Sequence, residues 1–387
     1  MNILVTGAGG FLGRNLLAHL NRRESLAITS FDAENSRDDL RAALKTADIV
    51  YHLAGVNRPR TDQEFEGGNA GLTGDLCALL SELGRAPLIV FSSSVQAALD
   101  NPYGVSKRHA EYRLREFAAE SGAQVRIYRL KNVFGKWSRP DYNSAVATFC
   151  HNVARDLPIR ISEPSRELEL VYVDDVMEAF LGELTERVYD RHAGDCPGGI
   201  PSFRLTLGDL VGRIQSMHAM HANLLTPDFA VRFNRQLFAT YLSYVPDAAR
   251  RRQLKIQADG RGQLAEFLKS SHFGQIFVSR TRPGVTRGNH YHHSKAERFL
   301  VVEGRGLIRM RPIESSEVVE YRVRGEAFQV VDVPPGWTHS IENVGAGEMV
   351  TLFWTAEIFD PDRPDTYYLP VLLPSQAPEP IPAGLTG

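Results

Sequence analysis

Cysteine is scarce in this sequence. The 387 residues include three cysteines, Cys77, Cys150 and Cys196, and these are widely spaced. An odd number of isolated cysteines does not form a disulfide framework, so we expect a protein of a reducing compartment, the cytoplasm.

Long apolar runs and an excess of one charge are also absent. No segment approaches the ~20 consecutive apolar residues that a membrane-spanning helix needs. The first residues, MNILVTGAGGFLG, lack the basic leader and long apolar stretch of a signal peptide. The formal net charge of -2 gives no electrostatic reason to expect nucleic acid or an anionic membrane as a partner. We therefore expect a soluble protein that binds neither.

The sequence changes in kind about two thirds of the way along. Up to residue 246, strand-like and helix-like segments alternate, which predicts a doubly wound parallel sheet of the Rossmann type with helices on both faces. The expected strands are residues 2–6, 27–31, 49–53, 88–91 and 125–129, and the expected helices are residues 13–22, 38–45, 72–83 and 103–121.

From residue 262 to 370, short strands follow one another with glycine and proline turns between them, which predicts an all-β barrel or sandwich. The basic stretch 247–261 is typical of a solvated linker. The proline-rich tail, 371–387, is predicted to be disordered. The expected strands of this second domain are residues 274–280, 298–302, 307–311, 318–322, 328–333 and 349–354.

A glycine motif lies at the first strand–helix junction. Gly7, Gly10 and Gly13 permit a tight turn, let backbone N–H groups approach a pyrophosphate, and bring it to the positive end of a helix. Asp32 ends the second expected strand, where a carboxylate holds the ribose hydroxyls of NAD and repels a 2′-phosphate. Arg37 follows and could bind such a phosphate. The motif predicts a dinucleotide site, and the residues alone favour NADH.

A tyrosine and a lysine follow the fourth expected strand. Tyr103 and Lys107 share one face of the expected helix because residues four apart are neighbours on a helix surface. An ammonium group beside a phenol lowers the phenol's pKa, so that the phenol can exchange a proton with a substrate oxygen while hydride moves. A serine of the run 92–94 can hydrogen-bond the same oxygen. With the glycine motif upstream, this set favours a reductase site over a surface pair.

Residues 1–245 resemble the extended short-chain dehydrogenase/reductase family. The resemblance rests on TGAGGFLG, on HLAG at residues 52–55, on the serine, tyrosine and lysine, and on segments 129–135 and 172–176. It implies that Tyr103 is the catalytic acid, that Lys107 holds the nicotinamide ribose, and that Ser94, with Ser93 as the alternative, is the catalytic serine. The residues it implies in cofactor binding are Gly7, Gly10, Phe11, Leu12, Gly13, Asp32, Arg37, Leu53, Ala54, Gly55, Tyr103 and Lys107.

A second set of residues has the spacing of a metal site. His290 and His292 face the same side of a strand, because strand side chains alternate. Glu297 on the next strand and His339 further along complete a set of three nitrogens and one oxygen. Zinc, expected first, or iron, manganese or nickel would accept this set. His293 should face the opposite way from the ligands.

The metal-site segments resemble the two motifs of the cupin superfamily, over residues 262–370. The second motif departs from the pattern: Phe328 stands where a glycine is expected. If the metal site is catalytic, an acid or base is needed beside it. The flanking candidates for that role are Tyr291, His293 and Lys295, and none is preferred.

The fusion of the two domains resembles a family of enzymes of capsular polysaccharide synthesis. That resemblance implies that the cupin domain epimerises C3 of UDP-2-acetamido-2,6-dideoxy-4-hexulose. The reductase domain would then reduce the C4 ketone to UDP-N-acetyl-6-deoxy-L-talosamine, on the route to UDP-N-acetyl-L-fucosamine. The family uses NADPH whereas Asp32 favours NADH, so we expect NAD(P)H without choosing between them.

Two other functions stay open. One is a nucleotide-sugar 4-epimerase or dehydratase with a purely structural cupin. Val95 and Gln96 follow Ser94 where dehydratases place an acidic pair, which disfavours dehydration. The other is a non-catalytic sensor of sugar nucleotides, which the intact Tyr103 and Lys107 disfavour. Cupins are often dimeric, so we also expect a homodimer.

Overall fold

The computed structural model describes residues 1–184 and 199–373. They form two compact units: residues 1–215 together with 232–247, and residues 216–231 together with those from 248 onward. The stretch expected to be a linker, 247–261, contains a short helix, α10 (Asp247–Arg250). It also contains strand β9 (Ile256–Asp259), which pairs with β10 (Gly262–Ser270) of the second unit.

A parallel sheet of five strands, in the order β2-β1-β3-β4-β5, forms the centre of the first unit. From β1 the chain continues to β2 on one side and then crosses to β3 on the other side of β1. The direction in which strands are added therefore reverses between β1 and β3. In such sheets ligands bind outside the carboxyl ends of the strands at this reversal. The strands are β1 (Asn2–Thr6), β2 (Ala27–Phe31), β3 (Ile49–His52), β4 (Leu88–Ser94) and β5 (Val125–Leu130).

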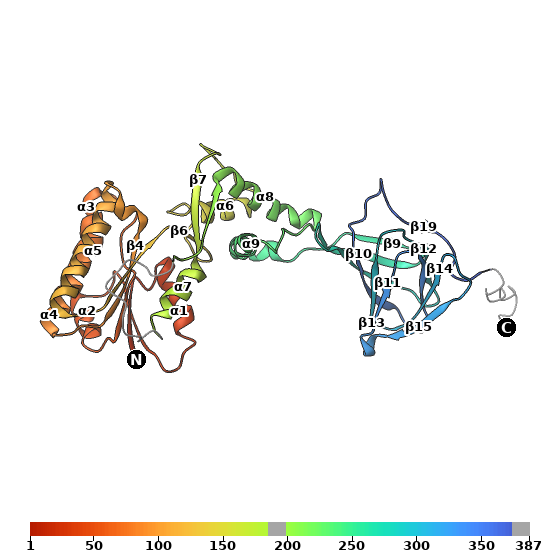
Figure 1. The fold of residues 1–387 in the computed structure, drawn as a ribbon, viewed down its shortest axis with the longest axis horizontal. Coiled ribbons are helices and arrows are strands. Elements are labelled where there is room, and N and C mark those ends of the chain that lie inside the picture. Colours follow the sequence, from red (N-terminus) through yellow and green to blue (C-terminus); the bar gives the residue numbers. More distant parts are fainter. Residues whose placement is uncertain (185–198, 374–387) are drawn as a thin grey trace. The chain divides into compact units, whose positions relative to one another are not determined.

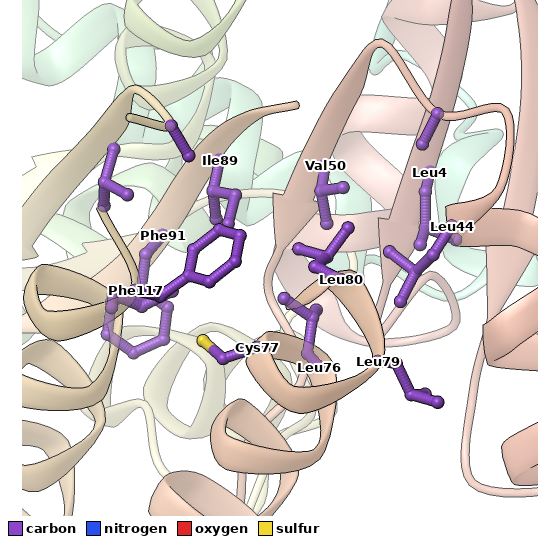
Figure 2. Packing of buried hydrophobic residues seen from close by; sticks show 14 of the residues in the cluster. Leu4, Leu44, Val50, Leu76, Cys77, Leu79, Leu80, Ile89, Phe91 and Phe117 are labelled. Carbon is purple, nitrogen blue, oxygen red and sulfur yellow. The ribbon is translucent and has the colours of Figure 1, made fainter. Parts of the chain in front are cut away.

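Both faces of this sheet are apolar, and helices cover each of them (Figure 1). Alternate strand residues such as Leu4 and Val50 pack against α2, α4 and α5 (Figure 2). The residues between them, such as Ile3 and Tyr51, pack against α1 and α7. The predicted Rossmann-type class is confirmed. The helices are α1 (Phe11–Leu20), α2 (Arg37–Leu44), α3 (Asp62–Phe65), α4 (Leu72–Leu83), α5 (Pro102–Ser121), α6 (Ala145–Val153), α7 (Val173–Gly182), α8 (Leu207–Asn223) and α9 (Arg232–Tyr244).

A smaller sheet of three strands, in the order β6-β7-β8, follows β5 in the chain. Three short irregular helices complete the secondary structure: a π-helix at Glu66–Gly71 and 3₁₀ turns at Val95–Ala98 and Gly325–Ala327. No helix of the described residues is long and apolar enough to cross a membrane. The small sheet comprises β6 (Asn132–Phe134), β7 (Glu167–Tyr172) and β8 (Ser202–Thr206).

Two antiparallel sheets with a shared apolar core form the second unit, as the cupin resemblance predicted. Their orders are β16-β13-β18-β11-β10-β9 and β15-β14-β17-β12-β19. The core between them includes Phe299, Ile308, Ile341 and Phe353. The remaining strands are β11 (Gly274–Thr281), β12 (Thr286–Tyr291), β13 (Glu297–Glu303), β14 (Arg305–Pro312), β15 (Val319–Arg324), β16 (Val330–Val333), β17 (Trp337–Asn343), β18 (Met349–Thr355) and β19 (Tyr367–Tyr368).

Two details differ from the sequence-based expectations. Phe328, expected to begin a strand, precedes β16 and has φ 46°, the left-handed conformation that the missing glycine would favour. Val371, expected to begin a disordered tail, is fully buried, and its carbonyl accepts a hydrogen bond from Arg311 Nε. The rest of the predicted disorder, 374–387, lies outside the described residues.

Candidate active sites

The glycine turn between β1 and α1 requires two of its glycines on steric grounds. Gly7 has φ 68°, and a Cβ there would lie 2.7 Å from the Ala54 Cα. A Cβ on Gly13 would lie 2.1 Å from the Gly7 carbonyl oxygen. Gly10 precedes α1 without a side-chain cap, so the first N–H groups of the helix are available to an anion such as a pyrophosphate.

Asp32 lies against this turn. Its carboxylate accepts the Gly9 amide, with Oδ1 and Oδ2 at 3.1 and 2.9 Å from the nitrogen. Arg37 is the first residue of α2 and is exposed. After β3, the amides of Leu53 and Ala54 donate to the backbone and side chain of Thr6 at 3.2 Å, which fixes this segment beside the glycine turn.

Lys107 is buried at the carboxyl ends of β3 and β4. Its Nζ donates to the Ser92 carbonyl at 3.0 Å and lies 4.9 Å from the centre of the Phe91 ring. A Cβ on Gly55 would lie 3.2 Å from Nζ, so glycine leaves room for the ammonium group. Burial lowers the pKa of Lys107 to about 8, and Glu111 opposes this shift.

Ser94 and Ser93 differ in their partners. Ser94 interacts with Tyr103 and lowers the pKa of its phenol, whereas the Ser93 hydroxyl donates to Glu111 Oε1 at 2.5 Å. Since adjacent strand residues face opposite sides, only one of the two faces the tyrosine. We expected Lys107 to lower the pKa of Tyr103. In the structure burial raises that pKa, and the interaction with Ser94 is the opposing influence.

Sequence reasoning missed Glu111, which is buried one helical turn beyond Lys107. Its carboxylate binds Arg129 through Nε at 3.0 Å and Nη2 at 2.6 Å. The available signal was the spacing, since Tyr103, Lys107 and Glu111 recur at intervals of four residues on one helix. Ser93 therefore contacts Glu111 on α5 and does not face Tyr103.

The structure brings all four predicted metal-binding residues together in the second unit. The ligand atoms of His290, His292, Glu297 and His339 lie within 4.8 Å of one another. His290 comes from β12, Glu297 from the start of β13 and His339 from β17. A bulge at Asn289, with φ 60°, shifts the β12–β17 register so that His290 pairs with His339.

Two of these histidines are oriented by main-chain carbonyls. His292 Nδ1 lies 2.5 Å from the Asp365 oxygen, and His339 Nδ1 lies 3.2 Å from the Trp337 oxygen. Because a carbonyl only accepts, each Nδ1 carries a proton, and in the neutral ring Nε2 is the nitrogen that presents a lone pair. Both Nε2 atoms are buried without a hydrogen-bond partner, yet they lie 3.3 and 3.1 Å from the Glu297 carboxylate oxygens. This donor set fits a divalent metal ion.

The electrostatics of the cluster also suit a cation. Burial and the neighbouring His339 lower the pKa of His290 to about 4, so its ring is neutral and able to bind a metal. The pKa of Glu297 is well below its usual range, because contacts with His292 and His339 outweigh the effect of burial. The carboxyl group is therefore ionised, as metal binding requires.

The three flanking candidates for acid–base chemistry lie elsewhere. Tyr291 stacks on Tyr367 with ring centres 5.3 Å apart, and the exposed His293 packs edge-on against both rings. Lys295 is buried, and its Nζ donates to the Pro364 carbonyl at 2.7 Å. Among the described residues, none of the three hydrogen-bonds to the four clustered side chains or packs a ring against them, and Lys295 acts on His292 only through its charge. The structure therefore does not select a base.

The fold and the two sites define a short-chain dehydrogenase/reductase joined to a cupin. Residues 3–193 match the NAD dependent epimerase/dehydratase family, and residues 257–367 match the polysaccharide biosynthesis C-terminal domain. The chain is 42% identical over 367 residues to UDP-2-acetamido-2,6-beta-L-arabino-hexul-4-ose reductase of Pseudomonas aeruginosa, covering 95% of this chain and 98% of that protein.

Two solved structures are similar to this chain to different extents. The capsular polysaccharide assembling protein CapF of Staphylococcus aureus superposes with a TM-score of 0.89 and 42% identity, covering 96% of this chain and 100% of that one. UDP-glucuronic acid 4-epimerase of Bacillus cereus, at 18% identity, a TM-score of 0.53 and 63% coverage of this chain (98% of that one), shares the fold alone. The chain belongs to the family of CapF and this hexulose reductase.

Proposed function

We propose that this protein is a bifunctional enzyme of capsular polysaccharide synthesis. Its cupin unit epimerises C3 of UDP-2-acetamido-2,6-dideoxy-4-hexulose. Its first unit then reduces the C4 ketone with NAD(P)H to UDP-N-acetyl-6-deoxy-L-talosamine. The observation that supports the reductase step is the meeting of Ser94, Tyr103 and Lys107 at the strand ends, in a chain 42% identical to a hexulose reductase over 367 residues.

The reductase residues have distinct tasks in this proposal. The nicotinamide supplies the hydride that reaches C4 of the sugar. Tyr103 donates its phenolic proton to the ketone oxygen, and Ser94 holds that oxygen by a second hydrogen bond. Burial favours the protonated phenol, as an acid in the reductive direction requires. Lys107 holds the nicotinamide ribose and stabilises the phenolate that forms.

The epimerase step uses the acidity of the hydrogen next to a ketone. A base removes the C3 proton, and a proton returned to the opposite face inverts the centre. A divalent metal held by His290, His292, Glu297 and His339, zinc in our proposal, would supply Lewis-acid stabilisation of the ketone oxygen. Reduction of the ketone then removes the acidity and prevents reversal.

We also propose that the enzyme acts in the cytoplasm as a homodimer. The sparse cysteines support a reducing compartment. The cofactor is the least constrained part of the proposal, because Asp32 beside the glycine turn favours NADH and the family resemblance favours NADPH.

The test uses deuterated water. The UDP-hexulose is incubated with the full-length enzyme, first without and then with nicotinamide cofactor, and C3 is followed by NMR. We expect deuterium at C3 without cofactor and oxidation of the cofactor once it is added. Tyr103→Phe should still exchange the C3 proton for deuterium but should not reduce the C4 ketone. His339→Ala should lose the exchange at C3.

Each outcome decides one step. Reduction without any exchange at C3 would remove the epimerase role and leave the cupin as a structural unit. Exchange without reduction in the wild type would remove the reductase role. Cofactor that stays bound and is not consumed would favour the 4-epimerase alternative.

A further inference from the structure

The connection from β18 to β19 does more at the metal site than supply the Asp365 carbonyl described above. Residues 359–366, FDPDRPDT, form most of this connection, which runs from residue 356 to residue 366. Within this connection Asp365 is half-buried and has φ 38°. A left-handed conformation is costly for most residues and least so for glycine, asparagine and aspartate. The contacts of Asp365 explain why the chain adopts it here.

The carboxylate of Asp365 holds the turn that follows β12. Oδ1 accepts the amide of His293 at 2.9 Å, and Oδ2 accepts the amides of Ser294 and Lys295 at 3.0 and 3.1 Å. The Ser294 hydroxyl adds a fourth hydrogen bond at 3.0 Å. One side chain therefore satisfies three consecutive backbone donors directly after His292.

The main chain of the same residue holds His292 itself. The Asp365 carbonyl accepts His292 Nδ1–H at 2.5 Å, which leaves the buried Nε2 directed toward Glu297. Lys295 Nζ ties the neighbouring Pro364 carbonyl to the same turn at 2.7 Å. His292 is thus fixed from both sides by one loop, which the sequence separates from it by about 70 residues.

We propose that Asp365 is a positioning residue for the metal site, which sets the tautomer and orientation of His292 by anchoring the loop to the turn 293–295. This inference rests on the metal site proposed above. Histidine ligands depend on the acceptor of their other ring nitrogen, and loss of such an acceptor costs 10–100-fold in metal affinity. Metal binding and the position of the 356–366 loop are therefore coupled.

The experiment compares full-length wild type with Asp365→Ala, Asp365→Asn and the control Asp362→Asn. Asp362 lies in the same loop; its side chain is exposed, and the hydrogen bond described for this residue comes from its backbone amide. Zinc affinity is measured by competition with a chromophoric chelator, and the ligand field by the absorption of bound Co²⁺. We expect Asp365→Ala to lose about 10–100-fold in zinc affinity and to alter the Co²⁺ spectrum. Asp365→Asn should lose less, because asparagine tolerates the left-handed conformation and keeps one acceptor oxygen.

The outcomes separate this inference from the metal site itself. Wild-type protein that binds neither zinc nor Co²⁺ would overturn the metal site. Wild-type protein that binds both, together with Asp365 variants of unchanged affinity and spectrum, would overturn the role of Asp365. Equal losses of zinc affinity in Asp362→Asn and Asp365→Asn would also overturn it, because the loss would then come from the reduced negative charge of the loop. Circular dichroism confirms that each variant is folded, and Asp365→Asn carries the test if Asp365→Ala is not.

Discussion

Glu111 lies one helical turn beyond Lys107 on α5 and opposes the effect of burial on its ammonium group. Burial lowers the pKa of Lys107 to about 8, and the Glu111 carboxylate acts in the other direction. His52, the nearby imidazole, is neutral because burial lowers its pKa to about 3. Glu111 is thus the carboxylate that helps to keep Lys107 charged at neutral pH.

The first prediction follows from that pair. Reduction should weaken as pH rises through about 8, because Lys107 then loses its charge. Glu111→Gln removes the charge that raises this pKa, so the alkaline limb of kcat/KM should move to lower pH. The measurement is kcat/KM from about pH 6 to about pH 9.5, a range that extends to both sides of the lysine pKa. Glu116→Gln, an exposed change on the same helix, should leave the limb in place; an unmoved limb in both variants would contradict the prediction.

The second prediction separates the two serines. Ser94→Ala should lower kcat by roughly 10–100-fold, because a hydrogen bond to the reacting oxygen is lost. Ser93→Ala should leave kcat nearly unchanged and lower the free energy of unfolding by about 1–3 kcal/mol, because it removes a partner of the buried Glu111. Steady-state kinetics and urea unfolding of both variants are the measurements. The reverse pattern would assign catalysis to Ser93.

The third prediction concerns the choice of cofactor. Asp32→Ala should raise the ratio of kcat/KM for NADPH to that for NADH by about tenfold or more, because a carboxylate repels a 2′-phosphate. Arg37→Ala should lower the same ratio if its guanidinium binds that phosphate. Initial rates with both cofactors at fixed ionic strength give the ratios. A ratio that neither change alters would place recognition of the phosphate elsewhere.

The fourth prediction concerns the metal. His339→Ala should abolish tight zinc binding. The melting transition of the second unit should then no longer shift on adding zinc, because zinc stabilises the folded protein only if the folded protein binds it. His293→Ala is the matched control, since that ring is exposed and packs against Tyr291 and Tyr367. Differential scanning calorimetry with and without zinc measures the shift. The same zinc response in both variants would contradict the assignment of His339.

The fifth prediction concerns stability. Phe328 is 68% exposed and has φ 46°, so Phe328→Gly should raise the free energy of unfolding by about 1 kcal/mol. Phe267→Gly is the control: Phe267 is also exposed but lies within strand β10, where glycine costs roughly 0.5–1 kcal/mol. Chemical denaturation of the two variants decides the sign. A loss of stability in both would show that the Phe328 ring packs usefully.

The sequence patterns predicted the first unit well because its strands are buried on both faces. The expected bounds of β1 and β2 agree with the structure, and apolar runs and helical periodicity located the others. β4 was predicted to end at Phe91 but continues to Ser94. The run of three serines had left the choice of serine open, and the continuous strand places residues 93 and 94 on opposite sides.

The second unit was harder to predict. β17 was absent from the expected strands, and a strand at β12 was expected only from the spacing of His290 and His292. The metal-binding histidines replace apolar residues on the inner face of both strands. The spacing of His290, His292 and Glu297 still predicted the cluster, which the structure brings together. Asp365 left no such signal, because its contacts join segments about 70 residues apart and local patterns carry no information on them.

The acceptors of the two histidine Nδ1 protons are both main-chain carbonyls, those of Trp337 and Asp365. A codon change replaces a side chain but leaves a carbonyl in every residue. At Asp365 the side chain also holds the loop in place, so a substitution there moves its carbonyl. At Trp337 it is the carbonyl that contacts His339 Nδ1, so its role should persist through most substitutions. His339 would therefore keep its orientation where Trp337 is replaced, whereas His292 depends on one particular side chain at position 365.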